Sequence, residues 1–366
     1  MKIGILTSSR ADYGIYYPLL NKMKKDSFFK LEIIAFGTHC SKFHGYTLNK
    51  IEQDSYSKVH EISALISNDN AQSISTSYGL TLLKFADFWA YNEFDMVFCL
   101  GDRFEMSAAV QAGIPFGIKF THLYGGDTTL GAIDNIYRHQ ITLASYLHFT
   151  STDFYKIKIS KLIDSVDNIF SIGTISLDEI STFKPIDKNK FYSKFNIPYE
   201  DYALITFHPE TMAINSNSNY ASEMKKALKK ISNSLYLVVT MPNADTLGTT
   251  YRTSLEELKS EKPNRILLIE NFGKENYFSA MNYAKILIGN TSSGIVEAAS
   301  FNKYVVNVGD RQKGRIQSKN ILDSKFDAKE IILKSNKAIG LGDFIGENIY
   351  YKSGATDKII KIIKEI

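Results

Sequence analysis

Residues 96–103 read MVFCLGDR, and this stretch shows how the fold is built. Its first five residues form an apolar run of the length of a buried strand, and Gly101 then lets the chain turn into Asp102 and Arg103. Residues 103–113 continue with helical periodicity. A short apolar strand, a polar turn and a helix make up one step of a parallel βαβ unit, and the rest of the chain repeats this step.

The same alternation runs through both halves of the chain. Strands are expected at residues 2–7, 31–37, 96–100, 116–123 and 146–150, and again at 202–208, 235–240, 265–270, 286–289 and 304–308. Helices are expected at residues 17–25, 75–91, 103–113 and 136–144, and again at 221–232, 255–260, 277–284 and 294–300. We therefore predict an α/β protein with two doubly wound, Rossmann-like domains whose strand ends face one cleft.

The expected domains are residues 1–175 and 176–366, with the last helix able to pack back on the N-terminal domain. Residues 184–199 carry Lys, Asp, Asn and two prolines and are expected to be the linker.

Composition narrows the class of protein. The 366 residues carry a net charge of +4, and the lysines are scattered, which disfavours nucleic-acid binding. Cys40 and Cys99 are the only cysteines, and Cys99 lies in an apolar run, which indicates a reducing compartment. The N-terminal apolar run is too short for a signal peptide, and no stretch approaches about 18 apolar residues. We expect a soluble, cytoplasmic protein with no membrane partner.

Arginine marks the candidate site. Only 7 of the 43 basic residues are arginine, and five of them, Arg10, Arg103, Arg138, Arg311 and Arg315, lie in four short polar motifs. The planar, always-charged guanidinium suits phosphate or carboxylate, and the motifs with Arg10, Arg103, Arg311 and Arg315 carry glycine or follow a predicted strand. These motifs therefore predict one anionic site. The alternative is a set of surface ion pairs, each contributing about 0–1 kcal/mol.

Two loops have the position of phosphate-binding loops. Residues 7–10 (TSSR) and 289–294 (GNTSSG) each follow a predicted strand and precede a helix, where backbone N–H groups and the helix dipole favour an anion. Neither is a Walker or G-x-G-x-x-G motif, so no ATP or dinucleotide cradle is indicated. Ser292, Ser293 and Gly294 are candidate diphosphate contacts, and Glu297 could accept from ribose hydroxyls. The alternative for this loop is an ordinary helix cap.

The densest polar stretch is residues 122–139, HLYGGDTTLGAIDNIYRH. Its Asp127 and Asp134, with Asp102 at an earlier strand end, are a possible acid/base cluster. Neighbouring carboxylates do not both ionise easily, so one can serve as acid and another as base. The alternative is that Asp and Gly form turns here.

Other residues allow two explanations. His208 closes a predicted strand and could hold substrate, or be structural; Phe272 could stack on a base, or fill the core. The seven histidines lack metal-ligand spacing and there is no Cys pair, so no catalytic metal is expected. No cofactor is expected either, since the chain carries no Walker or dinucleotide-binding motif.

Taken together, these motifs resemble the hydrolysing UDP-N-acetylglucosamine 2-epimerases, in the branch that feeds sialic and related nonulosonic acids. The resemblance rests on SRADYG (9–14), GDR (101–103), GGD (125–127), GAID (131–134), RH (138–139), FHPET (207–211), PNAD (242–245), GNTSSGIVE (289–297) and GDRQKGR (309–315). It implies a fold like the two-domain GT-B glycosyltransferases, with UDP held mainly by the C-terminal domain, and a homodimer.

The resemblance also implies roles for single residues. Asp102, Asp127, Asp134, Arg138 and His208 match catalytic positions. The positions around the UDP-sugar are matched by Arg10, Asn243, Phe272, Ser292, Ser293, Gly294, Glu297 and Arg311. The family commonly has Glu where this chain has Asp127, and Ser where it has Thr291.

The implied reaction converts UDP-N-acetylglucosamine and water to N-acetylmannosamine and UDP, by elimination to a 2-acetamidoglycal and hydration. Three alternatives stay open: a hydrolysing 2-epimerase of UDP-N,N'-diacetylbacillosamine on a legionaminic acid route, a GT-B glycosyltransferase, and a non-enzymatic UDP-sugar sensor. For the epimerase reaction, the expected partner is its substrate, a UDP-N-acetylhexosamine.

Overall fold

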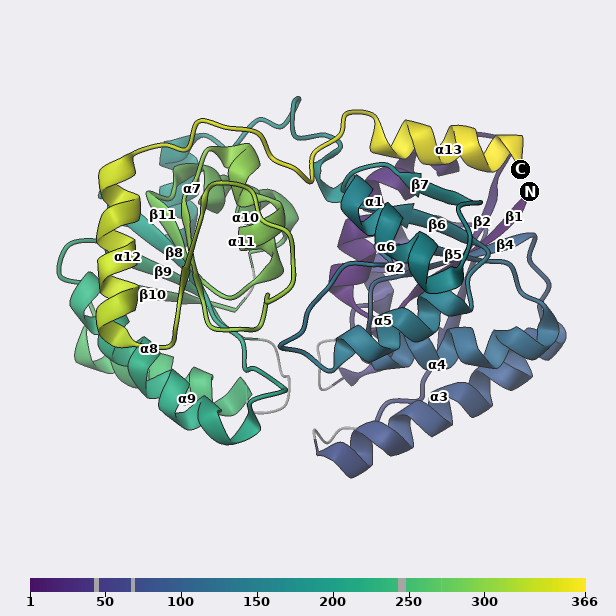
Figure 1. Cartoon of the computed structure of the whole chain (residues 1–366), viewed down its shortest axis with the longest axis horizontal. Coiled ribbons are helices and arrows are strands. Elements are labelled where there is room, and N and C mark those ends of the chain that lie inside the picture. Colours follow the sequence, from purple (N-terminus) through teal and green to yellow (C-terminus); the bar gives the residue numbers. More distant parts are fainter. Residues whose placement is uncertain (43–45, 67–69, 243–247, 271) are drawn as a thin grey trace. The chain divides into compact units, whose positions relative to one another are not determined.

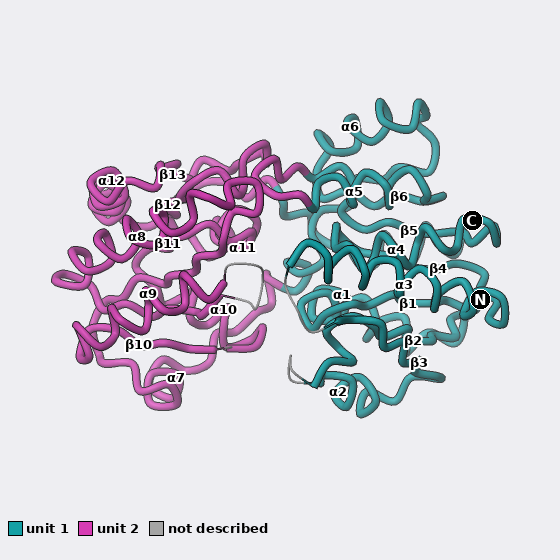
Figure 2. Tube along the Cα trace, turned by 90° about the horizontal axis from the view of Figure 1, so that it is seen from below, with its two compact units in different colours: residues 1–127, 134–179, 350–366 teal, residues 128–133, 180–349 magenta. Residues whose placement is uncertain are grey.

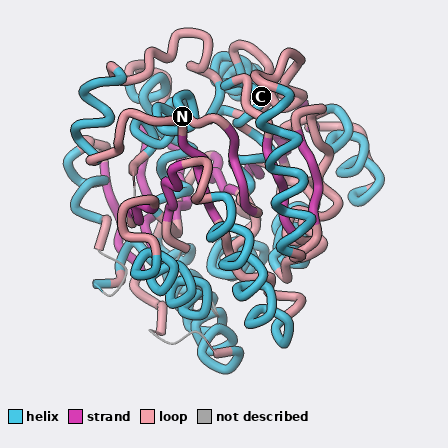
Figure 3. The backbone as a smooth tube through the Cα atoms, turned by 90° about the vertical axis from the view of Figure 1, so that its left-hand side faces the viewer, coloured by secondary structure: helices cyan, strands magenta, loops and turns pink. Residues whose placement is uncertain are grey.

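The computed structural model describes residues 1–366 except 43–45, 67–69, 243–247 and 271. The chain divides into two compact units, each built on a parallel sheet with helices packed on it (Figures 1 and 2). Unit 1 comprises residues 1–127, 134–179 and 350–366, and unit 2 comprises residues 128–133 and 180–349. Helices and loops surround the strands (Figure 3). The predicted α/β class with two doubly wound units is confirmed.

The sheet of unit 1 has the strand order β3-β2-β1-β4-β5-β6-β7, with every neighbouring pair parallel. In that order the strands are Lys58–Ile62, Lys30–Phe36, Lys2–Thr7, Met96–Leu100, Phe120–Leu123, Leu147–Thr150 and Ile169–Ser171. The strand order reverses between β1 and β4, so the crevice outside their carboxyl ends is the expected ligand position.

Both faces of this sheet are buried, which explains its continuous apolar strands. Ile3 and Ile5 of β1 point into one core cluster and Leu6 points into the other. The helices of unit 1 are α1 (Arg10–Lys24), α2 (Leu48–Gln53), α3 (Ala71–Tyr91), α4 (Phe104–Gly113), α5 (Asp134–Leu143), α6 (Asp153–Ile163) and α13 (Ala355–Glu365).

Helix α13 belongs to unit 1 although it ends the chain. Ala355, Ile359 and Ile363, spaced four residues apart on one helical face, are buried in the same cluster as α1. The carboxylate of Asp178 accepts from the backbone N–H of Ala355 at 2.7 Å and fixes the start of the helix. Lys22 of α1 pairs with Asp357 at 2.8 Å. The last helix therefore completes the core of unit 1.

Unit 2 repeats the plan with the order β10-β9-β8-β11-β12-β13, again all parallel. These strands are Ile266–Ile269, Tyr236–Thr240, Tyr202–Thr206, Ile286–Gly289, Val305–Val308 and Ile321–Ser324. Its helices are α7 (Lys188–Phe195), α8 (Asn217–Ile231), α9 (Gly248–Glu261), α10 (Lys274–Tyr283), α11 (Ser292–Val296) and α12 (Ala328–Leu341). The order reverses between β8 and β11, which mirrors the reversal between β1 and β4.

The units differ from the expected domains, because residues 176–179 and 350–366 belong to unit 1. Residues 128–133 are grouped with unit 2, although the residues on either side of them are grouped with unit 1. The expected linker at 184–199 contains helix α7, which buries Phe191 and Tyr192 in unit 2. In the part of the chain that the structure describes, no helix has the length and apolarity needed to cross a membrane.

Candidate functional site

The first candidate loop follows β1. Ser9 caps α1, its side chain accepting from the backbone N–H of Asp12 at 3.3 Å. Asp12 in turn accepts from the backbone N–H and the hydroxyl of Ser8, at 3.0 and 2.6 Å. These polar groups therefore form an ordinary helix cap, the alternative weighed for such loops. Arg10, at the first position of α1, has an exposed side chain that can reach a ligand.

Arg138 of α5 joins two of the predicted carboxylates. Its Nη2 donates to Oδ2 of Asp102, which follows β4, and its Nη1 donates to the main-chain oxygen of Asp127 at 2.6 Å. Arg138 is only 2% exposed, and Asp127 is 4% exposed. The carboxylate of Asp127 accepts from the hydroxyl of Ser151, after β6, at 2.8 Å. The charged group that contacts the carboxylate of Asp102 here is thus the guanidinium of Arg138, which orients the carboxylate.

Asp134 occupies the first position of α5, one helical turn before Arg138. Residues four apart share a helix face, so the two side chains start from the same side of α5. Asp134 is half-buried. Its place in a three-carboxylate cluster stays a prediction.

His122 supports this arrangement from inside the sheet. One ring nitrogen lies 2.9 Å from the oxygen of Gly101 and the other lies 3.1 Å from the hydroxyl of Thr142. Thr142 donates to the main-chain oxygen of Arg138 at 2.9 Å. Burial lowers the pKa of His122 to about 3, so the ring is neutral at physiological pH. It fixes the turn that carries Asp102 instead of carrying charge itself.

In unit 2, Asn290 ties together the loops at the strand ends. Its fully buried side chain accepts from the backbone N–H of His208 at 2.7 Å and donates to the oxygen of His208 at 2.8 Å. Its main-chain oxygen accepts from Gln312 Nε2 at 2.9 Å and from Arg311 Nη1 at 3.2 Å. Asn290 therefore places His208 and Arg311 in one fixed arrangement outside β8 and β11.

The loop 289–294 lies against β8. Gly289 has φ of +149°, and a Cβ there would lie 1.8 Å from the oxygen of Thr206, so only glycine fits. Thr291 caps the five-residue helix α11, and the hydroxyl of Ser293 lies 2.7 Å from that of Tyr277. Ser292 is exposed and Gly294 is buried. The predicted helix with Glu297 inside it is shorter than expected, because Glu297 is its C-cap.

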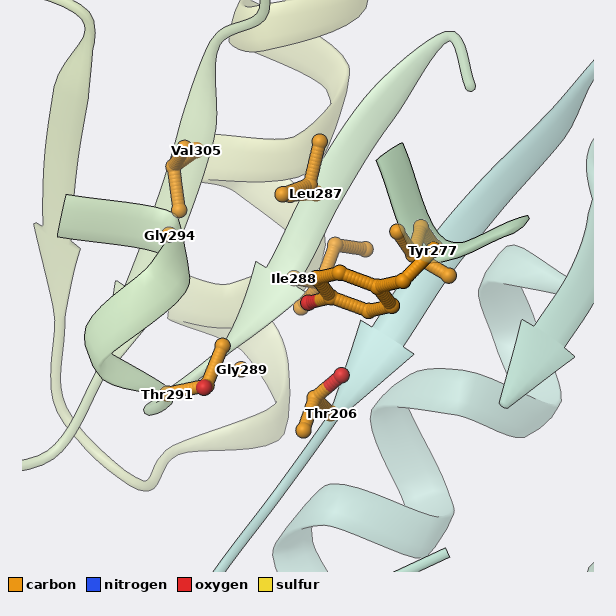
Figure 4. A pocket seen from close by; sticks show the side chains of 9 residues that line it. Thr206, Tyr277, Leu287, Ile288, Gly289, Thr291, Gly294 and Val305 are labelled. Atoms are coloured by element: carbon orange, nitrogen blue, oxygen red, sulfur yellow. The ribbon is translucent and has the colours of Figure 1, made fainter. Parts of the chain in front are cut away.

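A small cavity lies behind this loop, lined in part by Thr206, Tyr277 and Thr291 (Figure 4). Its volume is about 10 Å³, room for about one water molecule. A nucleotide cannot enter it. A ligand would have to meet the outer side of the loop, where Ser292 is exposed.

Two of the predicted contacts need comment. Phe272 is 5% exposed and packs against Phe191 and Phe195, with ring centroids 6.0 and 4.7 Å away. This position favours the core-filling explanation over stacking on a base. Asn243 lies outside the described residues.

Several supporting residues were missed. Among them, His122, Ser151, Asn290 and Glu210 hold the predicted residues through buried hydrogen bonds. His122, Asn290 and Glu210 lie inside the quoted motifs 122–139, 289–294 and 207–211, whereas Ser151 gave no signal in the sequence.

Comparison with known proteins places the chain in a family. The model of a protein family described as UDP-N-acetylglucosamine 2-epimerase matches residues 21–364. Polysialic acid biosynthesis protein P7 of Escherichia coli is 30% identical over 100% of this chain and 94% of its own length. The GDP/UDP-N,N'-diacetylbacillosamine 2-epimerase (hydrolyzing) of Campylobacter jejuni is 34% identical over 89% of this chain and 85% of its own length.

A solved structure supports the fold. The UDP-GlcNAc 2-epimerase of Neisseria meningitidis, solved with UDP-GlcNAc bound, superposes with a TM-score of 0.82 over 100% of both chains at 14% identity. The family match over residues 21–364 and the two relatives at 30% and 34% identity show that the chain belongs to the UDP-N-acetylglucosamine 2-epimerase family.

Proposed function

We propose that this chain is a hydrolysing UDP-N-acetylglucosamine 2-epimerase, which converts UDP-N-acetylglucosamine and water to N-acetylmannosamine and UDP for nonulosonic acid biosynthesis. The observation that carries the proposal is the arrangement around Arg138, which orients Asp102 and the backbone of Asp127 at the strand ends of unit 1. Acid/base groups held in this way suit proton transfer at a sugar carbon.

The diphosphate is assigned to unit 2. Arg311 has a guanidinium fixed by the oxygen of Asn290, and Ser292 is exposed at the neighbouring loop. Guanidinium groups and hydroxyls suit the oxygens of a leaving UDP, and donors fixed before the reaction stabilise charge as it develops. Arg10 and His208 are proposed to contact the diphosphate or the sugar, and Glu297 the ribose.

The proposed reaction has two steps. In the first, a carboxylate removes the proton from C2 while the C1–O bond to UDP breaks, which gives 2-acetamidoglycal and UDP. In the second, water adds at C1 and C2 receives a proton from the opposite face, so the sugar is released with C2 inverted. Each positioned acid or base is expected to contribute roughly 10²–10⁴-fold.

Isotopes test this reaction directly. Turnover in deuterated water should place deuterium at C2 of the released sugar, and turnover in ¹⁸O-water should label C1 and leave UDP unlabelled. NMR and mass spectrometry of the products, in reactions without any acceptor, read both labels. Unlabelled C2 with its original configuration would indicate simple hydrolysis, and no sugar release without an acceptor would favour the glycosyltransferase or the sensor.

A second substrate is favoured by one finding. The Campylobacter jejuni relative, at 34% identity, is named for GDP/UDP-N,N'-diacetylbacillosamine. Comparing kcat/KM for the two UDP-sugars decides between them, and a ratio above about tenfold in either direction, equivalent to 1.4 kcal/mol, names the substrate.

The cytoplasmic location and the homodimer also stay proposals. Analytical ultracentrifugation of the purified chain at several concentrations tests the second, and a sedimentation coefficient of one 41.3 kDa chain would contradict it.

A further inference from the structure

Glu210 is a buried acid that the proposed reaction does not use. It follows β8 in the sequence His208-Pro209-Glu210, and its side chain is 3% exposed. Its Oε1 accepts from the backbone N–H of Asp310 at 2.6 Å and from that of Arg311 at 3.0 Å. Burial raises the pKa of Glu210, and these two backbone hydrogen bonds oppose the shift. The carboxylate therefore accepts hydrogen bonds from the backbone of the loop that carries Arg311.

The loop is shaped to receive this carboxylate. Gly309 has φ of +81°, and a Cβ there would lie 2.3 Å from Oε1 of Glu210 and 2.4 Å from the ring of Phe326. The turn at Gly309 directs the next two backbone N–H groups to one point, as in the backbone nests that bind anions. Glu210 fills this nest from within the protein. Because those two N–H groups already donate to Glu210, they cannot donate to the phosphate of a ligand.

Glu210 is itself fixed. Asn217 of α8 accepts from the backbone N–H of Glu210 at 2.9 Å and donates to its oxygen at 3.0 Å. The hydroxyl of Tyr251 donates to the same Asn217 oxygen at 3.2 Å. On the other side of the loop, the oxygen of Asn290 holds the Arg311 guanidinium. The backbone and the side chain of Arg311 are thus held by different partners.

We infer that Glu210 is a positioning residue for Arg311: its carboxylate anchors the backbone of the loop so that the guanidinium, and not the loop amides, meets the diphosphate. The inference rests on the proposed function, because it takes UDP as the ligand of Arg311. It adds a buried acid, outside the proton-transfer chemistry, to the groups on which UDP affinity depends.

The test is a double-mutant cycle on UDP affinity, measured by calorimetry with the full-length chain. Glu210→Ala is expected to weaken UDP binding about tenfold, within the range of coupling found for residues of one hydrogen-bond network. In an Arg311→Ala background the same substitution should change affinity less than about twofold, because the group it positions is gone. Glu210→Gln keeps an oxygen that can accept both N–H groups and should restore affinity to within about threefold of wild type.

A matched control separates positioning from stability. Glu223 of α8 also holds a backbone N–H in unit 2, that of Ala328 at 2.9 Å, at the start of α12. Glu223→Ala should lower the melting temperature and leave UDP affinity unchanged. Equal losses from Glu210→Ala with and without Arg311, or an unchanged affinity in Glu210→Ala, would overturn the inference. A wild-type chain that does not bind UDP would instead overturn the proposed function.

Discussion

The guanidinium of Arg138 and the carboxylate of Asp102 form an ion pair that joins helix α5 to the end of strand β4. The arginine side of the pair is 3% exposed and the aspartate side 25%, so one end is fixed in the protein while the other faces outward. The same guanidinium holds the backbone of Asp127. One side chain thus sets the direction of one candidate acid and the chain path of another.

Replacing Arg138 should therefore damage turnover more than binding. Lysine cannot bridge both partners with one ammonium, so Arg138→Lys and Arg138→Met should each lower kcat by about 10²-fold, the cost of a small misplacement of a catalytic group. UDP affinity should stay within about threefold. Arg252→Met, which removes a paired arginine at the surface of unit 2, serves as the control and should leave kcat unchanged. Near-normal turnover in Arg138→Lys would contradict the role given to the guanidinium.

The carboxylates themselves should be needed for chemistry and not for holding UDP. Asp102→Asn and Asp134→Asn keep the shape of the side chain and remove its charge, so each should lower kcat by roughly 10²–10⁴-fold if it acts as acid or base. Steady-state kinetics and UDP calorimetry on the same preparations separate the two effects. If both variants turn over normally, neither Asp102 nor Asp134 acts as the acid or the base.

The diphosphate contacts should show the opposite pattern. If these side chains contact the diphosphate as proposed, Arg10→Ala, Ser292→Ala and Arg311→Ala should weaken UDP binding as well as catalysis, because the product UDP would make the same contacts. For the two arginines the loss should be about tenfold or more, as expected for a hydrogen bond to a charged group. Arg265→Ala, whose arginine pairs with Glu200, is the control. Unchanged UDP affinity in all three variants would show that these residues do not contact the diphosphate.

Gly131 offers a steric test of the segment 128–133. The backbone N–H of Leu130 donates to the oxygen of Lys313 at 2.9 Å, and a Cβ on Gly131 would lie 2.2 Å from the oxygen of Asp310. Because that neighbour is backbone, Gly131→Ala must displace the segment that leads to Asp134. We expect kcat to fall about tenfold or more, since misplaced catalytic groups lose rate steeply.

The control for Gly131 is Gly340→Ala. Gly340 lies in α12, and nothing within 4 Å would meet its Cβ. Kinetics like those of wild type are expected for this variant. Equal activity in both alanine variants would show that the path of the segment does not matter for turnover.

Unit 1 should lose stability in acid. Burial lowers the pKa of His122 from 6.5 to about 3, and those of His39 and His148 to about 4. Between these values and pH 6.5 the unfolded chain binds protons that the folded unit does not, so the free energy of unfolding falls as the pH falls through this window. Each histidine contributes up to about 1.4 kcal/mol per pH unit.

Trp89 makes this measurable, because it is the only tryptophan and lies buried in α3 of unit 1. Urea unfolding followed by its fluorescence at pH 5, 6 and 7 gives the slope for the unit that contains all three histidines. In His122→Asn the slope should decrease by about 1.4 kcal/mol per pH unit between pH 5 and 6. A slope equal to that of wild type would mean that His122 is protonated in the folded protein.

The sequence predicted the inner strands of both sheets and the edge strand β10, and missed the edge strands β3, β7 and β13. β1, β4 and β11 begin and end where their apolar runs predict, because both faces of a central strand are buried. The edge strands β3 and β13, with sequences KVHEI and ILDS, carry polar residues on the solvent side and give no continuous run. Helix α7 has the composition expected of a linker, because the segment 184–199 around it carries Lys, Asp, Asn and two prolines.

The candidate site shows the same division. Glycines, aspartates and arginines at strand ends carry a signal in the sequence, since few structural needs place them there together. The residues that hold them, such as Glu210 for Arg311 and Ser151 for Asp127, are far away along the chain and look like ordinary polar residues. Contacts over such sequence distances exist only in the folded unit.

The return of helix α13 to unit 1 has a consequence for synthesis of the chain. The core around α1 lacks Ala355, Ile359 and Ile363 until these residues have left the ribosome, so unit 1 cannot finish folding when its first 179 residues have emerged. Unit 2, whose residues 180–349 all emerge earlier, can complete its sheet first. Unit 1, most of which is synthesised first, therefore completes its core last. Until then an apolar face of the nascent chain is exposed and can bind chaperones or aggregate.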